Sequence, residues 1–134
     1  MRPLLALLFL IGLALAPPML MAQPHRGERT VELRLGHSTN LAQGTILSFD
    51  KVIADSRCPV DVTCVWAGEA KLQFSVRQPS QRAEDFVLTT PLAPEVEIAK
   101  WRIKIVTLLP PRHSGDGDKK LAYVVTLAVT PLGD

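Results

Sequence analysis

The sequence has no marked excess of charge of either sign. Lys and Arg number 15 and Asp and Glu number 13 among 134 residues. Arg2 is the only charged side chain in the first 22 residues, so the remainder has 14 basic and 13 acidic side chains. Proteins that bind nucleic acid usually concentrate basic residues against the phosphates. This balance gives no support for a nucleic-acid partner.

Side chains arranged for catalysis or metal binding are also scarce. No serine lies in a nucleophile-elbow pattern, and His25, His37 and His113 all lie in polar stretches typical of loops. Asp116 and Asp118, in SGDGDKK, resemble the start of a calcium loop, but the later ligands and the closing glutamate are missing. We therefore expect no catalytic residue, no metal site and no cofactor.

Long apolar runs are absent except at the N-terminus. There, residues 1–22 have a basic start, an apolar run from Leu4 to Ala16 and small residues before a cleavage site after Ala22. This pattern predicts a secretory signal peptide, since the run is too short to anchor the chain in a membrane. We expect residues 23–134 to form a single domain that is periplasmic or secreted, with no stable membrane anchor after cleavage.

Cysteine is nearly absent, because Cys58 and Cys64 are the only two. In an exported protein two cysteines favour one structural disulfide over a free nucleophile or a zinc site. Pro59 fixes one backbone dihedral inside the loop, so the segment should be rigid. Asp55 and Arg57 lie just before it, where they could pair with each other or bond the loop backbone.

After Cys64 the chain alternates between apolar and polar residues up to Arg77, which predicts a half-buried strand. Gly68 within it indicates a bulge or a close backbone approach. Trp66 and Trp101 are both in phase with apolar neighbours, so we expect both indoles to pack in the core.

Five further segments alternate or are apolar, whereas residues 91–99, with Pro91 and Pro94, are expected to be a loop. A change of parity near Asp50 indicates a bulge, and the apolar last segment is expected to be a central strand. Six or seven strands without an amphipathic helix predict an all-β antiparallel β-sandwich with one disulfide, and a small β-barrel is the alternative. The further strand segments are 31–35, 45–49, 86–90, 101–107 and 121–129.

The string DSRCP, then four residues, then CVWAG resembles a signature of small exported bacterial proteins and lipoproteins, most of them uncharacterised. The likeness extends to LSFDKVIA before it and, more loosely, to the last two strands, which is about half of the mature chain. It implies an all-β exported domain with a structural disulfide and carries no activity to transfer. Many such proteins are lipid-anchored, whereas this chain has no cysteine near its signal to accept a lipid.

Two functions follow. The first is a non-catalytic binding module of the bacterial envelope, which presents a rigid surface to an unknown envelope or extracellular protein; an inhibitor of a protease or lysozyme is its sharpest form. The expected form is a monomer, and an exposed Arg57 would serve contact whereas an inward one would serve folding. The candidate surface comprises Asp55, Arg57, Pro59 and Asp61. The alternative is an envelope enzyme or metal-binding protein that uses His37, His113, Asp116 and Asp118.

Overall fold

The computed structural model describes residues 27–133, so the predicted signal peptide and His25 lie outside the described residues. Within this part the chain forms eight strands and one short 3-10 turn at Ala42–Gly44. The strands are β1 (Arg29–Arg34), β2 (Ser38–Asn40), β3 (Ile46–Asp55), β4 (Ala70–Arg77), β5 (Glu84–Thr90), β6 (Glu95–Ile98), β7 (Trp101–Leu109) and β8 (Val124–Pro131). In the same residues no helix is long and apolar enough to cross a lipid bilayer.

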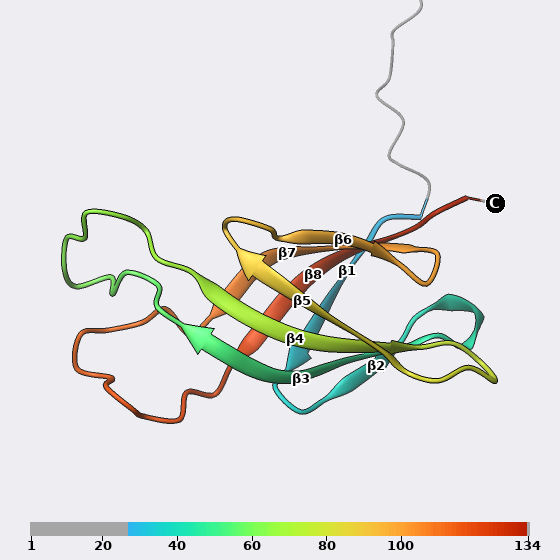
Figure 1. Ribbon diagram of the computed structural model, residues 1–134, viewed down its shortest axis with the longest axis horizontal. Coiled ribbons are helices and arrows are strands. Elements are labelled where there is room, and N and C mark those ends of the chain that lie inside the picture. Colours follow the sequence, from blue (N-terminus) through green and yellow to red (C-terminus); the bar gives the residue numbers. More distant parts are fainter. Residues whose placement is uncertain (1–26, 134) are drawn as a thin grey trace, which may run out of the picture.

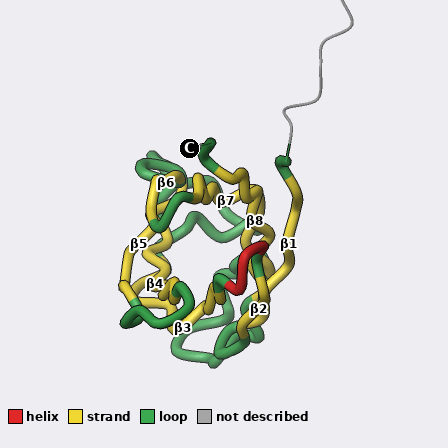
Figure 2. Tube along the Cα trace, turned by 90° about the vertical axis from the view of Figure 1, so that its right-hand side faces the viewer, coloured by secondary structure: helices red, strands yellow, loops and turns green. Residues whose placement is uncertain are grey.

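The strands form two four-stranded antiparallel sheets that pack against each other (Figure 1). One sheet has the order β1-β8-β7-β6 and the other the order β2-β3-β4-β5. Figure 2 shows the two layers end on. The sheets do not close into a barrel, so the predicted β-sandwich is confirmed and the alternative barrel is wrong.

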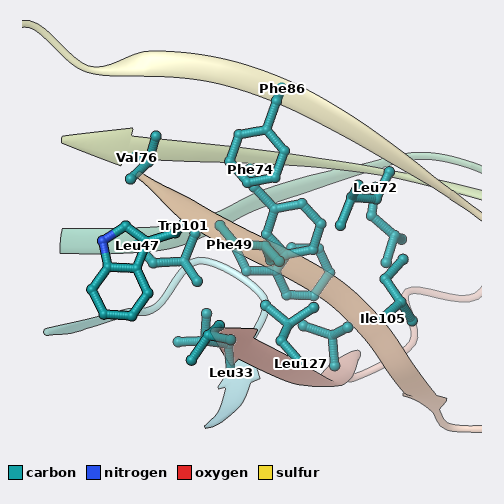
Figure 3. Close-up of a cluster of buried hydrophobic side chains, with 14 of the residues drawn as sticks. Leu33, Leu47, Phe49, Leu72, Phe74, Val76, Phe86, Trp101, Ile105 and Leu127 are labelled. Atoms are coloured by element: carbon teal, nitrogen blue, oxygen red, sulfur yellow. The ribbon is translucent and has the colours of Figure 1, made fainter. Parts of the chain in front are cut away.

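The core is built from the apolar side chains that alternate along the strands and point inward. Phe49, Phe74 and Phe86 lie opposite one another on β3, β4 and β5, with ring centroids 5.0 Å and 5.5 Å apart along the stack (Figure 3). Stacked pairs of this kind add about 0.5–1.5 kcal/mol each beyond the area they bury. Trp101 on β7 is 5% exposed, which confirms its predicted core position.

Two short strands were not expected from the sequence. Residues 91–99, predicted as a loop, contain β6, and β2 lies between the predicted strands 31–35 and 45–49. In the first case Pro91 and Pro94 both precede the strand and do not interrupt it, so the backbone donors of β6 remain available to pair with β7. Both are edge strands of three or four residues, a length at which an alternating pattern is too short to recognise.

Other local predictions hold. The register of β3 against β4 shifts between Phe49 and Lys51, which confirms the bulge, and shifts again between Val52 and Ala54. The last strand, β8, lies between β1 and β7, which confirms that it is central.

The two longest connections project from one end of the sandwich. The disulfide loop (residues 56–69) joins β3 to β4, and the β7–β8 loop (residues 110–123) joins the strands for which it is named (Figure 1). The described chain begins and ends at the opposite end, where Gly27 lies against the ring of Pro131. The two loops therefore lie at the end of the sandwich opposite to Gly27, the first described residue.

Candidate functional site

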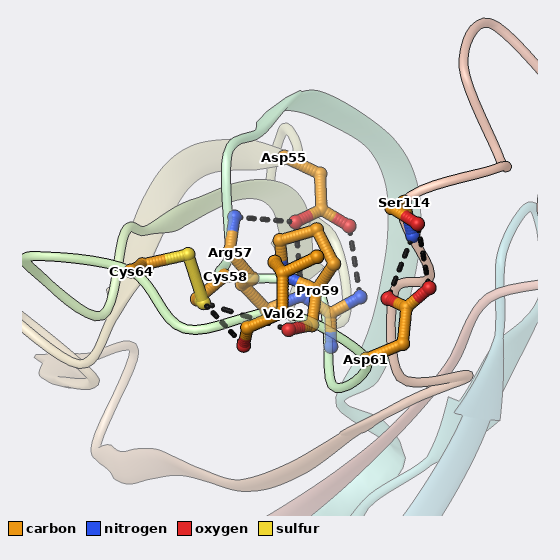
Figure 4. Close-up of a disulfide and its surroundings, with 8 residues drawn as sticks. All are labelled: Asp55, Arg57, Cys58, Pro59, Asp61, Val62, Cys64 and Ser114. Atoms are coloured by element: carbon orange, nitrogen blue, oxygen red, sulfur yellow. Dashed lines mark hydrogen bonds and ion pairs between the residues drawn. A yellow bond between two sulfur atoms is a disulfide. The ribbon is translucent and has the colours of Figure 1, made fainter.

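The disulfide loop begins as an extension of the β3–β4 hairpin. The Ser56 amide donates to the Glu69 carbonyl at 2.7 Å, and the Cys58 amide donates to the Ala67 carbonyl at 2.9 Å. Cys58 and Cys64 are joined by a disulfide with their Cα atoms 6.0 Å apart, which confirms the predicted bridge (Figure 4). The irregular part of the loop is thereby reduced to the residues between these ties.

Gly68 is required by a close backbone approach. Its φ is +70°, and a Cβ placed on it would lie 1.9 Å from the carbonyl oxygen of Ser56. A side chain would therefore meet backbone that cannot move aside. The predicted close approach is confirmed, and it brings together the two arms of the disulfide loop.

Asp55 and Arg57 form a bidentate pair at the entrance to the loop. The Arg57 Nε donates to Asp55 Oδ1 at 2.9 Å and its Nη2 donates to Oδ2 at 2.8 Å (Figure 4). Oδ2 also accepts the hydroxyl of Tyr123 at 3.0 Å, and Oδ1 accepts the Arg57 amide at 3.2 Å. The carboxylate is thus satisfied on both oxygens although its side chain is only 4% exposed.

These contacts shift the pKa values of Asp55 and Tyr123. Burial alone would raise the pKa of the Asp55 carboxyl, but the hydrogen bonds and charge of Arg57, with the bond from Tyr123, outweigh it and lower that pKa. For the phenol, burial comes first and the hydrogen bond to Asp55 second, and both raise the pKa of Tyr123. Asp55 is therefore held as an anion and Tyr123 as a neutral donor.

Arg57 also ties the disulfide loop to the other sheet. Its Nη1 donates to the carbonyl of Leu108 at 2.8 Å and its Nη2 to that of Pro110 at 2.9 Å. Arg112, on the β7–β8 loop, makes a further bond between the two sheets, since its Nη1 donates to the backbone carbonyl of Asp55. Arg57 is 18% exposed, so the question of its orientation is answered: it faces inward and serves the fold. We call Asp55, Arg57, Arg112 and Tyr123 the Asp55 cluster.

Asp61 makes a second tie between the two loops. Its Oδ1 accepts the Ser114 amide at 2.8 Å and its Oδ2 accepts the Ser114 hydroxyl at 2.5 Å (Figure 4). These bonds lower the pKa of the Asp61 carboxyl. Next to it the Val60 amide donates to the Arg112 carbonyl at 2.9 Å, and Pro59 is half-buried in a turn closed by Val62. The four residues of the predicted surface thus act mainly to hold the loop.

The side chains that the loop presents to solvent are apolar. Trp66 is 61% exposed and Val65 is fully exposed, so the predicted core position of Trp66 is wrong. The reason is that β4 begins at Ala70, and the last backbone tie, at Ala67, leaves Trp66 in the irregular part of the loop. Val60 and Val62 are exposed on the other arm. A signal was present in the sequence, because two valines lie between the cysteines and Val65 and Trp66 follow directly after Cys64.

The residues of the alternative hypothesis do not come together. His37 lies in the turn between β1 and β2, whereas His113, Asp116 and Asp118 lie in the β7–β8 loop. Asp116 accepts the amide of His113 at 2.7 Å and so closes a local turn. Over residues 27–133 no three His, Cys, Asp or Glu side chains are grouped so that they could hold a metal ion.

Comparison of the chain with models of protein families, with curated proteins and with solved structures finds no match. The likeness to exported proteins that share the DSRCP signature stays a prediction.

Proposed function

We propose that this protein is an exported, non-catalytic binding module that presents its disulfide loop to a protein of the bacterial envelope or its surroundings. The observation that carries the proposal is the set of exposed apolar side chains on a loop whose backbone is tied at several points. These side chains are Val60, Val62, Val65 and Trp66. Exposed apolar groups gathered in one place mark interaction surfaces more often than isolated ones do.

Rigidity supports the same function. The disulfide, the Asp55–Arg57 pair, the Gly68 approach and the Asp61–Ser114 bonds hold the loop before any partner arrives. A loop that is already ordered loses little conformational entropy on binding, so more of the contact energy becomes affinity. Tryptophan is among the residues that most often dominate interface energies, which makes Trp66 the expected anchor.

Two features of the chain support the proposal that it is exported. Residues 1–22 have the pattern of a signal peptide, and a disulfide persists in oxidising compartments such as the periplasm or the extracellular space. The near balance of charge and the absence of catalytic patterns in the sequence fit a protein partner better than nucleic acid or a substrate. A protease or lysozyme inhibitor is the most specific form of this function.

The test is capture from periplasmic and culture extracts, followed by identification and a direct affinity measurement with the purified partner. Trp66→Ala should weaken binding about 30-fold, the equivalent of a hot spot of about 2 kcal/mol. Val65→Ser should also weaken it, whereas Val87→Ser, the same change at an exposed valine on β5, should not. Equal affinity of all three variants and the wild type would rule out the disulfide loop as the binding surface.

A further inference from the structure

A groove of about 430 Å³ lies between the end of β3 and the β7–β8 loop, beside the Asp55 cluster. Its walls include Val52 and Ile53 on one side and Leu121 and Tyr123 on the other. Figure 1 shows the two elements that carry these residues, the arrowhead end of β3 and the loop that precedes β8. The exposed apolar residues of the disulfide loop are not among its lining residues, so the groove is a second surface.

Two cations line the groove without a carboxylate partner. Among the described residues neither Arg112 nor Lys119 makes an ion pair, and the Lys119 ammonium has no hydrogen-bond partner. Arg112 donates through Nη1 to a backbone carbonyl, and its buried Nε finds no acceptor in the same residues. A half-buried guanidinium in this state is under-satisfied, since a guanidinium has five N–H donors.

The carboxylates at the groove do not cancel these charges. Asp55 is already compensated by Arg57 and Tyr123. Asp118 is the other acidic residue of the lining, and it is exposed. Two uncompensated cations therefore face one uncompensated anion, which favours a ligand with a single negative charge.

The wall of the groove formed by β3 is an open sheet edge. β2 pairs with β3 only at Ile46, Leu47 and Ser48, and the last backbone bonds on that side join Phe49 to His37 and Gly36. From Asp50 to Asp55, β3 is paired with β4 on one side, and no other described strand pairs with it on the other. An unpaired edge offers backbone donors and acceptors to an added strand.

We propose that this groove binds the C-terminal carboxylate of an extended peptide segment. Arg112 and Lys119 hold the carboxylate, and the open edge of β3 pairs with the peptide backbone. Because Arg112 bonds the carbonyl of Asp55, the carboxylate lies at that end of β3 and the peptide runs parallel to the strand. Capture of a terminal carboxylate and addition of a strand are both established ways to recognise peptides. The site is independent of the binding proposed for the disulfide loop.

The test uses the exported protein with its disulfide formed and an N-acetylated tetrapeptide of alanine and valine with a free C-terminal carboxylate. Two comparison ligands are used: the same peptide with a C-terminal amide, and acetate alone. Calorimetry should show at least tenfold weaker binding of the amide, because hydrogen bonds to a charged group are worth about 1.5–3 kcal/mol and 1.4 kcal/mol is tenfold. Amide NMR shifts should change at residues 50–55 and 117–123.

Matched variants identify the charged side chains that act on the peptide carboxylate. Lys119→Ala should lower the affinity for the acid peptide several-fold. Lys120 is the exposed neighbour outside the groove lining, so Lys120→Ala should leave that affinity unchanged. Asp118→Asn should tighten binding, because it removes the one uncompensated anion. Arg112→Gln should abolish binding, but it also loses a bond to Asp55, so its melting temperature must be measured alongside.

Three results would overturn the proposal. Equal binding of the acid and amide peptides would show that the groove does not recognise the carboxylate. No binding of either peptide at millimolar concentration would show that the groove does not bind peptides. Acetate binding as tightly as the acid peptide would show a site for small anions without strand pairing. None of these results bears on the disulfide loop, whose test uses different variants.

Discussion

Removing the Arg57 side chain should destabilise the fold through the charge that it leaves behind. Arg57→Ala deletes two hydrogen bonds to the Asp55 carboxylate and two more to the carbonyls of Leu108 and Pro110. The carboxylate is 4% exposed, so water cannot simply replace the guanidinium. Stranding a buried charge in this way costs about 3–5 kcal/mol. Since a domain has only about 5–15 kcal/mol of stability, the variant should be close to unfolding.

The loss should depend on pH in a defined direction. In the wild type, burial raises the pKa of Asp55, but the bonds and charge of Arg57 outweigh burial and lower it. A lowered folded-state pKa adds stability that is complete above the unfolded-state pKa and disappears as pH falls through the folded-state value. In the variant, burial is opposed only by the remaining hydrogen bonds, the pKa of Asp55 rises, and protonation relieves the buried charge. The difference in unfolding free energy should therefore shrink from pH 7 to about pH 3.

Urea unfolding followed by far-ultraviolet circular dichroism at the two pH values measures this difference. Arg102→Ala is the control, because Arg102 also bonds a carboxylate, that of Glu97, but is 45% exposed. An exposed ion pair contributes little, so the control should unfold at nearly the wild-type urea concentration. The reasoning fails if Arg57→Ala costs no more than the control at pH 7, or if its cost is the same at both pH values.

Three further predictions concern the same end of the sandwich. Gly68→Ala should unfold the protein, because its Cβ would lie 1.9 Å from a backbone oxygen, whereas Gly36→Ala, at φ +80° in open space, should cost only about 1–3 kcal/mol in a thermal melt. Cys58→Ser with Cys64→Ser should lose about 2.4 kcal/mol by loop entropy, and an unchanged urea midpoint would contradict that. Tyr123 is the only tyrosine, so alkaline absorbance titration should show it ionising above its ordinary pKa, and Tyr123→Phe should cost about 1 kcal/mol; a normal titration would argue against its bond to the buried carboxylate.

The sandwich could be predicted because its long strands carry the period-two pattern in their own residues. On β4, Leu72, Phe74 and Val76 are buried and the polar residues between them are not. The central position of β8 could be predicted for a different reason, which is that both of its faces are largely apolar. The period-two pattern failed at β2 and β6, where only three or four residues pair and the partner strand decides the conformation.

The candidate site was harder to predict because it depends on where pairing ends. Trp66 is in phase with the core residues of β4, and nothing in the local pattern shows that the strand begins only at Ala70. Arg112 and Tyr123 were missed for a different reason. They lie more than 50 residues from Asp55 in the chain, and only the packing of the two sheets brings their donors to it.

The polar ties and the exposed apolar side chains of the disulfide loop depend on each other. An unrestrained loop with Val65 and Trp66 at 104% and 61% exposure would gain about 25 cal/mol for each Å² that it buried by folding back onto the sheets. The bonds made by Asp55, Arg57 and Asp61 oppose that collapse, because each joins the loop to a fixed position on the β7–β8 loop or on the strand beside it. The charged residues of the motif are therefore more important for the shape of the loop than for contact. Their substitution should weaken partner binding only as far as it disorders the loop, whereas substitution of Trp66 should weaken binding in a domain that melts like the wild type.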